Sequence, residues 1–256
     1  MVISQKFIKI KAPAKINLSL DVLKITASGY HETQTVIQEI PKIKDKLKII
    51  STKDSDATSI VYAPKFKGLK TPIPENDNLA HKALLLIKRT YKIKKFAHII
   101  ITKNIPISSG LGGASSDAAA VLKGLNKLWN LKISQKKLLT LAAKLGMDVP
   151  FFIIGGTALA THFGEKIKAL KPIKNVKFKI NPSSSFSTSK TASAYSSLDL
   201  SLCGKDLAKT KSLLKAIKNS DKKSILASFH NDFETLSPQK KGHHLSGSGP
   251  STFTSV

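Results

Sequence analysis

The first hundred residues alternate between apolar and polar positions, which is the pattern of half-buried β-strands. Turn residues such as Ser28-Gly29 divide this region into segments. We therefore expect strands over residues 7–11, 16–25, 35–40, 47–50 and 59–62. Because several strands follow one another before any helix, the pattern predicts an α+β fold with a mixed or antiparallel sheet.

Helical spacing begins at residue 78. Leu79, Ala83, Leu86 and Ile87 share one helix face, and Asn78, which precedes them, is a residue type that caps helices. Farther along the chain we expect strands over residues 98–102, 151–154 and 157–161, helices over 114–128, 135–145, 206–217 and 222–229, a Ser/Thr-rich loop beyond 182, and a glycine turn at 246–250.

The composition is that of a folded protein, because 41% of the 256 residues are hydrophobic and can bury a core. Cys203 is the only cysteine, which excludes an internal disulfide and a zinc site built on several thiolates. The N-terminus lacks the apolar stretch of a secretory signal, and no run approaches the roughly 18 apolar residues of a membrane helix. We therefore expect a cytoplasmic protein with no membrane partner.

The chain carries 42 Lys and Arg against 16 Asp and Glu, a formal net charge of +26. Such an excess is typical of nucleic-acid-binding proteins, so a basic nucleic-acid-binding module stays open as an alternative function. However, Arg89 is the only arginine, and the lysines alternate with apolar residues along the whole chain. This spacing is typical of the solvated faces of strands and helices, and we favour that interpretation over a nucleic-acid partner.

The strongest chemical signal is the segment I-P-I-S-S-G-L-G-G-A-S-S-D-A-A-A, residues 105–120. Its three glycines allow backbone N–H groups to converge on one point, and the helix that follows directs its positive end there. A phosphate chain fits such a site, and the two serines add hydroxyls for phosphate oxygens or a phosphate-bound Mg²⁺. The spacing matches neither a Walker A loop nor a dinucleotide-binding fingerprint. The alternative is an ordinary glycine turn capped by serine.

This glycine turn resembles the phosphate loop of the GHMP small-molecule kinases. Three further segments resemble motifs of that family in the same order and at similar spacing, namely A-P-A-K-I-N-L-S-L at 12–20, S-G-Y-H-E-T-Q-T at 28–35 and L-G-M-D-V-P-F-F at 145–152. Weaker matches lie at 75–79, 186–188, 231–234 and 246–251. The form of the turn is that of one branch of the family, which phosphorylates a cytidyl substrate in isoprenoid precursor synthesis.

The resemblance implies the two-domain GHMP kinase fold. Its ATP-binding N-terminal domain, similar to domain 2 of ribosomal protein S5, would cover residues 1–160, and a ferredoxin-like C-terminal domain would cover 161–256. Because the family continues beyond the last glycine turn, the second domain would be truncated and incomplete. We therefore expect the last strand to leave a sheet edge uncovered, with Phe253 partly exposed.

The resemblance also implies ATP as the phosphoryl donor and Mg²⁺ as its metal ion. Ser115 is expected to be the magnesium ligand as well as a nucleotide-binding residue. The residues expected to bind ATP are Asn78, Leu79, Lys103, Pro106, Ile107, Ser109, Gly110, Leu111, Gly112, Gly113, Ala114, Ser115 and Ser116.

For catalysis, the resemblance implies two residues. Asp148 would accept the proton of the attacking hydroxyl, and Lys15 would orient that hydroxyl and stabilise charge on the transferred phosphoryl group. The carboxylate of Asp148 lies among apolar residues and needs a charged partner, for which Lys15 is a candidate. From the residues alone, a helix-capping role next to Pro150 is an equal alternative for Asp148.

On the substrate side, the resemblance implies contacts from Asn17, Tyr30, His31 and Thr188. A tyrosine ring can stack on a pyrimidine and a histidine can bond to its edge, although a Tyr-His pair is also common in ordinary packing. The other histidines show no metal-ligand spacing, and we assign them structural or surface roles. The alternative enzyme is another GHMP kinase, acting on a mevalonate-type or amino-acid alcohol. The sequence does not indicate an oligomeric state.

Overall fold

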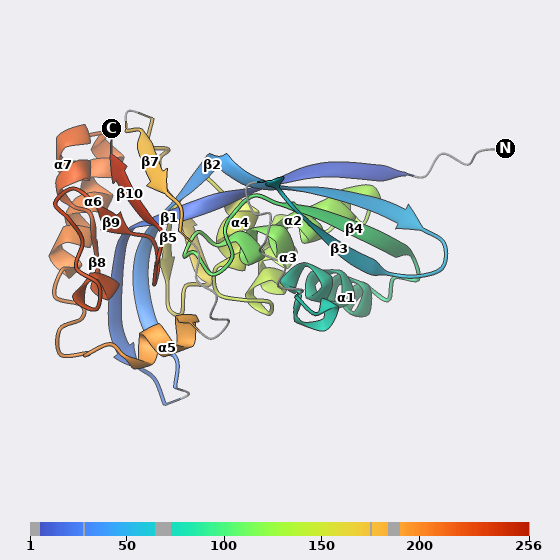
Figure 1. Cartoon of the computed structure of the whole chain (residues 1–256), viewed down its shortest axis with the longest axis horizontal. Helices are drawn as coiled ribbons and strands as arrows, with labels where there is room; N and C mark the ends of the chain where they lie inside the picture. The colour runs from blue at the N-terminus through green and yellow to red at the C-terminus, as the bar shows by residue number, and fades with distance from the viewer. Residues whose placement is uncertain (1–5, 28, 65–72, 175, 184–189, 256) are drawn as a thin grey trace. The chain divides into compact units, whose positions relative to one another are not determined.

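The computed structural model describes residues 6–27, 29–64, 73–174, 176–183 and 190–255 (Figure 1). The chain divides into two compact units, and each is assembled from three segments. The first unit comprises Met1–Ala14, Pro41–Ile105 and Gly112–Ile153, and the second comprises Lys15–Ile40, Pro106–Leu111 and Ile154–Val256. The two long N-terminal strands contribute residues to both units, so the division does not fall at one point of the chain. The expected domain boundary at residue 160 stays a prediction.

The sheet of the first unit has the order β3-β4-β2-β1. Strand β4 runs antiparallel to β2 and parallel to β3, and the register places Leu47 opposite Ile101 and Ile49 opposite Ile99. These four side chains are buried, so they supply the core face of the sheet. The bounds of the strands are Phe7–Ile25 for β1, His31–Thr52 for β2, Ala57–Tyr62 for β3 and Phe96–Lys103 for β4.

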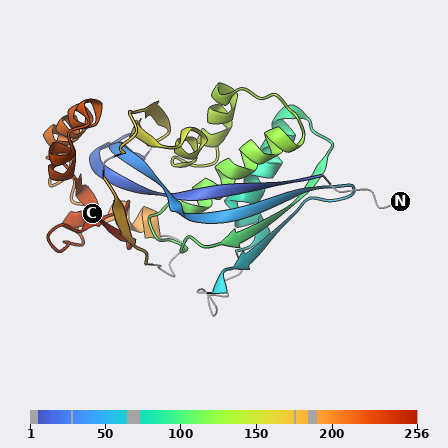
Figure 2. The same cartoon turned by 90° about the horizontal axis from the view of Figure 1, so that it is seen from above.

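Helices α1 (Leu79–Tyr91) and α2 (Gly113–Leu128) lie on one face of this sheet (Figure 2). A Cβ added at Gly124 of α2 would lie 2.5 Å from Cδ1 of Ile49 on β2, so glycine permits the close approach of the helix to the strand. The 3₁₀ turn η2 (Glu75–Asp77) precedes α1, and α3 (Gln135–Ala143) follows α2. In the described part of the chain, no helix combines the length and apolar character needed to cross a membrane.

The expected strands at 7–11 and 16–25 are one strand, β1, and those at 35–40 and 47–50 are one strand, β2. Our prediction of a break in β1 was wrong because the residues from Ala12 to Val22 are buried almost without interruption. A strand covered on both faces loses the apolar–polar alternation by which strands are recognised.

The apolar run at 151–154, which we expected to be a strand, belongs to helix α4 (Val149–Ile154). Pro150 lies in the first turn of this helix, where its missing N–H would have no partner within the helix. All residues from Val149 to Ile153 are buried, so the helix shows no polar face. A short run that is apolar on every side cannot be assigned to helix or strand by periodicity. The next expected strand, 157–161, is confirmed as β5.

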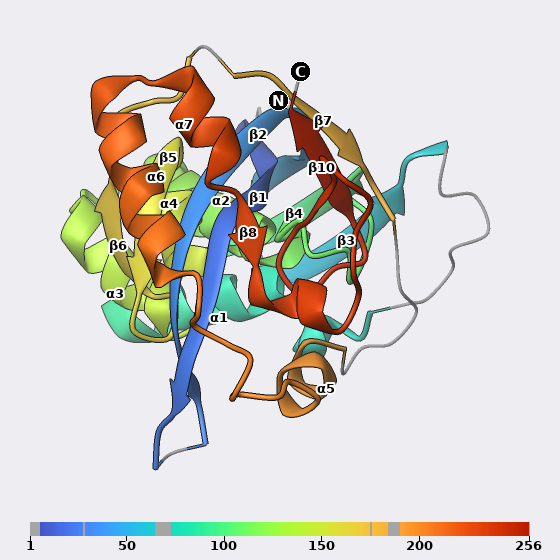
Figure 3. The same ribbon diagram turned by 90° about the vertical axis from the view of Figure 1, so that its left-hand side faces the viewer.

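In the second unit, β5 (Thr157–Thr161) pairs antiparallel with both β2 and β6 (Lys166–Ala169). Strand β1 pairs in parallel with β8 (His230–Asn231), and Ser19 lies opposite His230. Helices α6 (Leu207–Asn219) and α7 (Lys222–Ala227) lie side by side (Figure 3). Two further short elements of this unit are α5 (Lys190–Ser196) and the 3₁₀ turn η3 (Asp232–Thr235).

The expectation for the end of the chain was wrong. Strand β10 (Thr252–Ser255) is not an edge, because it pairs antiparallel with β7 (Phe178–Asn181) on one side and β9 (His244–Leu245) on the other. Phe253 is 0% exposed, and its ring lies 6.0 Å from Phe178 and 5.8 Å from Phe229. Strand β7 lies more than seventy residues earlier in the sequence, and the pattern of apolar positions did not predict it.

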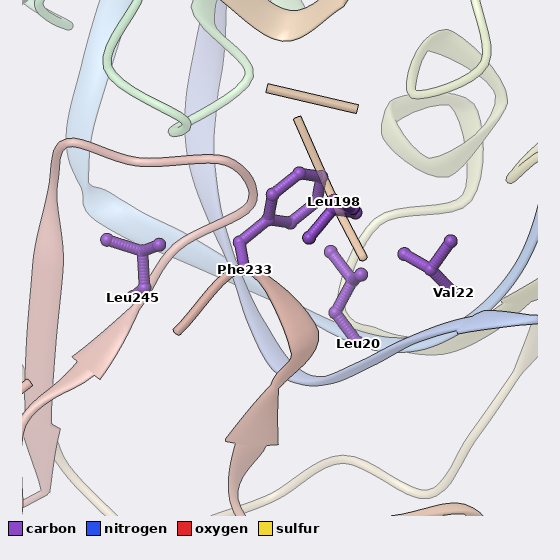
Figure 4. Packing of buried hydrophobic residues seen from close by; sticks show 5 residues of the cluster. All are labelled: Leu20, Val22, Leu198, Phe233 and Leu245. Carbon is purple, nitrogen blue, oxygen red and sulfur yellow. The ribbon is translucent and has the colours of Figure 1, made fainter. Parts of the chain in front are cut away.

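A hydrophobic cluster joins β1 to the C-terminal segments of the second unit (Figure 4). Its buried members are Leu20, Val22, Leu198, Phe233 and Leu245. The expected helices in this region are confirmed, with α6 beginning at Leu207 and α7 at Lys222. The cluster therefore holds the segment after α7 against the first strand, which is also the strand that carries Lys15.

A buried polar group lies next to this cluster. Nε2 of His230 lies 2.9 Å from Oδ1 of Asp21, and Nδ1 lies 3.0 Å from the carbonyl oxygen of Ser228. Thr210 donates to the other carboxylate oxygen of Asp21 at 2.6 Å. Because both ring nitrogens face acceptors, these contacts favour the doubly protonated, cationic ring of His230. Burial by itself lowers the pKa of His230, but the bonds to Asp21 and Ser228 and the charges of Asp21 and Asp206 outweigh burial and raise the pKa above its ordinary value.

This geometry predicts that stability falls as the solution becomes more basic. The pKa of His230 is raised in the folded state. Its contribution to the free energy of unfolding is therefore complete below about pH 6.5 and is lost as the pH rises through the pKa of the folded state. For one titrating group the slope is at most about 1.4 kcal/mol per pH unit between the two pKa values. Chemical unfolding between pH 6 and 9 should show a steeper fall of stability with pH for the wild type and for the control His98→Gln than for His230→Gln. Equal slopes in all three proteins would contradict the assignment.

Candidate active site

The glycine turn has the backbone conformation that its sequence predicts. Ser108, Gly110 and Gly112 have positive φ angles of 49°, 78° and 71°, and Gly112 is the N-cap residue of α2. The turn therefore runs directly into the helix, as expected. The first N–H groups of a helix have no partner within it and carry partial positive charge, so this segment can bind an anion.

A second glycine turn, Ser246–Pro250, packs against the first one. Oγ of Ser246 donates to the carbonyl oxygen of Gly110 at 3.0 Å, and the N–H of Ser251 donates to the carbonyl oxygen of Ser109 at 3.1 Å. A Cβ added at Gly110 would lie 2.0 Å from the carbonyl oxygen of Ser246, so only glycine permits this approach. Asn231 supports the second turn by donating to the carbonyl oxygens of Leu245 and Gly247, both at 2.9 Å.

Lys15 and Asn17 of β1 lie beside both turns. The N–H of Lys15 donates to the carbonyl oxygen of Leu111 at 3.0 Å, and its Nζ donates to Oδ1 of Asn17 at 2.6 Å. Asn17 in turn donates to Oγ1 of Thr35 at 2.8 Å. A Cβ added at Gly247 would lie 3.2 Å from Nζ of Lys15. Both side chains are buried, so the structure places a lysine ammonium with a fixed orientation next to the two glycine turns.

Lys103, at the end of β4, is held by two carboxylates. Its Nζ donates to Oδ2 of Asp45 and, at 2.7 Å, to Oδ2 of Asp117. Burial lowers the pKa of Lys103, but the charges of Asp117 and Asp45 outweigh it and raise the pKa to about 12. Burial raises the pKa of Asp117 to about 7, and Asp45 adds to the rise while Lys103 opposes it. The adenine contact expected of Lys103 stays a prediction. In the structure, its ammonium forms ion pairs with these two carboxylates.

The other residues expected to bind nucleotide lie on or near helix starts. Oδ1 of Asn78 accepts the N–H of Ala80 at 2.9 Å, which confirms Asn78 as the N-cap of α1. Leu79 is the first residue of that helix. Ser115 is half-buried in the first turn of α2, whereas Ser116 is buried, and its Oγ has no hydrogen-bond partner among the residues that the structure describes. Pro106 is buried, Ile107 is half-buried and Ala114 is exposed.

Asp148 lies in the turn between α3 and α4, directly before Val149, the first residue of α4. It is half-buried, while Val149 is 0% exposed. The N–H of Val149 donates to the carbonyl oxygen of Gly146 at 3.2 Å, which fixes the turn that carries the carboxylate. Asp148 belongs to the first unit and Lys15 to the second. The pairing of the two side chains therefore stays a prediction.

Tyr30 and His31 lie at the start of β2, next to a turn in which the N–H of Thr26 donates to the carbonyl oxygen of Tyr30 at 2.9 Å. The ring of Tyr30 is 5.4 Å from that of Phe163, and the ring of His31 is 4.9 Å from that of Tyr195. Tyr30 is 56% exposed, so much of its ring remains available to a ligand. Thr188 lies outside the described residues.

Sequence reasoning missed three side chains that shape this region. Ser246 and Asn231 belong to weakly matching segments, and the glycine-rich pattern around Ser246 could have drawn attention to it. Asp45 lies in a strand of alternating lysines and apolar residues that carries no motif. Among the described residues, no group of three or more His, Cys, Asp or Glu side chains forms a metal site.

Comparisons with known proteins agree with this geometry. The family model for the GHMP kinases N terminal domain matches residues 78–156, which include the glycine turn and Asp148. A 4-diphosphocytidyl-2-C-methyl-D-erythritol kinase of Alkaliphilus metalliredigens is 35% identical over 97% of this chain and 87% of its own length. The chain belongs to this family of GHMP kinases. A second member of the family, from Shouchella clausii, is 39% identical over 95% of this chain and 84% of its own length.

Solved structures place this GHMP kinase in the same fold. A crystal structure of 4-(cytidine 5'-diphospho)-2C-methyl-D-erythritol kinase has a TM-score of 0.72 and 28% identity, over 96% of this chain and 89% of that chain. Homoserine kinase from Cytophaga hutchinsonii has a TM-score of 0.74 at 20% identity, over 100% and 87% of the two chains, which shows the shared fold alone. The protein is therefore a small-molecule kinase with the α+β GHMP fold expected from its motifs.

Proposed function

We propose that this kinase transfers the γ-phosphoryl group of ATP to the 2-hydroxyl of 4-diphosphocytidyl-2-C-methyl-D-erythritol, a step of isoprenoid precursor synthesis. One observation carries most weight, namely that Ser246 joins the two glycine turns beside the buried ammonium of Lys15. Such an arrangement suits a phosphoryl group, because backbone N–H groups and one fixed cation can stabilise the charge on its oxygens. The names of the relatives support the choice of acceptor.

The nucleotide would bind at the glycine turn and the start of α2. The segment Gly110–Ser116 would bind the phosphate chain, and Asn78, Leu79, Lys103 and Ile107 would lie toward the adenine. The residues present fit a phosphate-bound Mg²⁺, because the buried Oγ of Ser116 has no hydrogen-bond partner within the described structure and Ser115 stands in the same helical turn. Ser115 would hold the ion, which would neutralise charge on the transferred group.

Two residues would carry out the chemistry. The carboxylate of Asp148 would accept the proton from the attacking hydroxyl, which increases the nucleophilicity of that oxygen. The ammonium of Lys15 would orient the hydroxyl and stabilise the phosphoryl oxygens in the transition state. The bond between Lys15 and Asn17 supports this role, because it fixes the lysine side chain before any substrate arrives.

The cytidine end of the substrate would be recognised by Tyr30 and His31, with Asn17 and Thr188 on the substrate side of the reaction. A half-exposed tyrosine ring can stack on the pyrimidine, and a histidine can bond to its edge. Recognition of the edge would exclude uracil, because the N4 donor of cytosine is replaced there by a carbonyl acceptor.

An assay of phosphoryl transfer tests this proposal. The wild type should phosphorylate the cytidyl substrate with ATP, and CDP but not UDP should compete with that substrate. Because Tyr30 already packs partly on Phe163, the double variant Tyr30→Ala/His31→Ala should raise the KM for the cytidyl substrate by about 10- to 100-fold. The KM for ATP should change by less than about twofold in the same variant.

The matched control is the double variant Tyr91→Ala/His98→Ala, which removes the same residue types from the end of α1 and from β4 and should leave both KM values unchanged. Phosphoryl transfer to a mevalonate-type or amino-acid alcohol, with no transfer to the cytidyl substrate, would contradict the proposed acceptor. The protein would still be a kinase. Normal use of the cytidyl substrate by the Tyr30/His31 variant would remove these two residues from the site.

A further inference from the structure

The first unit contains a buried ion cluster that involves the residues on either side of the glycine turn in the sequence. It consists of Asp45 on β2, Lys103 at the end of β4 and Asp117, the fifth residue of α2. The three side chains are 0%, 7% and 5% exposed. Burial of charged groups is costly unless they are paired, and this cluster places two carboxylates on one ammonium. Its charges therefore hold three elements of the unit together.

The second oxygen of Asp45 binds backbone instead of a side chain. Oδ1 accepts the N–H of Asn104 and, at 2.8 Å, the N–H of Ile105. These residues connect the end of β4 to Pro106, where the glycine turn begins. One carboxylate thus fixes the residues that enter the turn.

Asp45 is also linked, through Lys103, to the helix that follows the turn. Lys103, which is bound to Asp45, donates to Asp117, four residues after the first residue of α2. A Cβ added at Gly113 would lie 3.3 Å from Nζ of Lys103 and 3.1 Å from Cγ2 of Ile105. The ammonium therefore lies directly behind the first residue of the helix. Both ends of the glycine turn are tied to Asp45, one through its own oxygen and one through Lys103.

We propose that Asp45 is a positioning residue for nucleotide binding. It sets the distance and orientation between the segment that enters the glycine turn and the helix that leaves it, and so places the N–H groups that bind the phosphate chain. It does not touch the nucleotide. The inference rests on the proposed function, in that the glycine turn must bind a nucleoside triphosphate.

The same strand offers a matched control. At the other end of β4, Asp56 binds Lys88 with one oxygen and accepts the N–H of Ala97 at 2.9 Å with the other. Asp56 therefore joins Lys88 to the backbone of β4, and Asp45 joins Lys103 to the backbone directly after β4. The side chains of Asp56 and Lys88 are each 14% exposed, and their backbone contact lies at the opposite end of β4 from the residues that enter the glycine turn. Replacing either aspartate should destabilise the strand. Only the replacement of Asp45 should also lower the affinity for nucleotide.

The experiment compares Asp45→Asn with Asp56→Asn in the full chain. Asparagine keeps an oxygen for the backbone N–H groups but loses the charge that holds the lysine. Calorimetric titration with ATP and steady-state kinetics should show a rise of about 10- to 100-fold in the Kd and KM for ATP for Asp45→Asn. The KM for the acceptor should stay within about twofold. For Asp56→Asn the Kd and KM for ATP should not change, even if its melting temperature falls as much as that of Asp45→Asn.

Asp45→Glu is the second variant, for the case that Asp45→Asn does not fold. It keeps the charge, but its extra methylene displaces the carboxylate from Asn104 and Ile105, so the KM for ATP should again rise about tenfold or more. Unchanged ATP constants in the folded Asp45 variants, or equal changes in Asp56→Asn, would overturn the positioning role. A wild type that does not bind ATP would overturn the proposed function itself, and the two failures are therefore distinguishable.

Discussion

Replacement of Asp148 by asparagine is expected to lower kcat by roughly 10²- to 10⁴-fold, with ATP still bound. Asparagine has nearly the same shape as aspartate but cannot accept a proton from the attacking hydroxyl. The turn before α4 is fixed by its own backbone hydrogen bond between Val149 and Gly146, so the substitution should leave the fold intact. Single-turnover transfer and ATP titration of the same preparation measure the two effects.

The properties that change in the Asp148 variant separate a catalytic role from a structural role. A catalytic base affects kcat, whereas a residue that only caps α4 affects stability and ATP binding together. Thermal unfolding of the variant provides the control, and the melting temperature should change by only a few degrees. Parallel losses of ATP affinity, melting temperature and turnover would show that Asp148 is a capping residue.

Substitution of Gly110 by alanine is expected to weaken ATP binding by about 10²-fold or more and to reduce turnover accordingly. The added Cβ would lie 2.0 Å from the carbonyl oxygen of Ser246, a backbone atom that cannot move alone. The two glycine turns must therefore separate, and the bond from Ser246 to the carbonyl oxygen of Gly110 is lost. Titration with ATP measures the effect directly.

Gly242→Ala is the matched control for this substitution. Gly110 and Gly242 both have a φ of +78°, so alanine suffers the same backbone strain at either position, about 1–2 kcal/mol. However, nothing lies within 4 Å of a Cβ at Gly242. The control should lose stability but keep its affinity for ATP. Similar ATP constants in the two variants would mean that the contact between the turns does not shape the nucleotide site.

Local features of this protein were predictable because a few neighbouring residues decide them. The helix after the glycine turn, the Asn78 cap and strand β5 were all expected from short segments. In each, the determining chemistry lies within about four residues, as in the bond from the N–H of Ala80 to Asn78. Pattern and local hydrogen bonding are therefore sufficient to predict such elements.

Features that depend on distant segments were not predictable in this way. Phe253 is buried because β10 pairs with β7 as well as β9, and no local pattern reveals such a partner. The pattern predicted two strands where β1 is one, because burial on both faces removed the alternation. Helix α4 was mistaken for a strand for the same reason, since it is buried on all sides.

The sequence by itself determined the class of this protein, because the glycine turn and three further motifs are short segments whose residue types a phosphoryl-transfer site requires. Tertiary structure alone decided which charges support that site. The ammonium of Lys103 is shared by Asp45, 58 residues earlier, and Asp117, 14 residues later, while Ser246 reaches Gly110 across 136 residues. Charged and polar groups that are buried away from water need specific partners. These partners lie far apart in the sequence, so only folding brings them together.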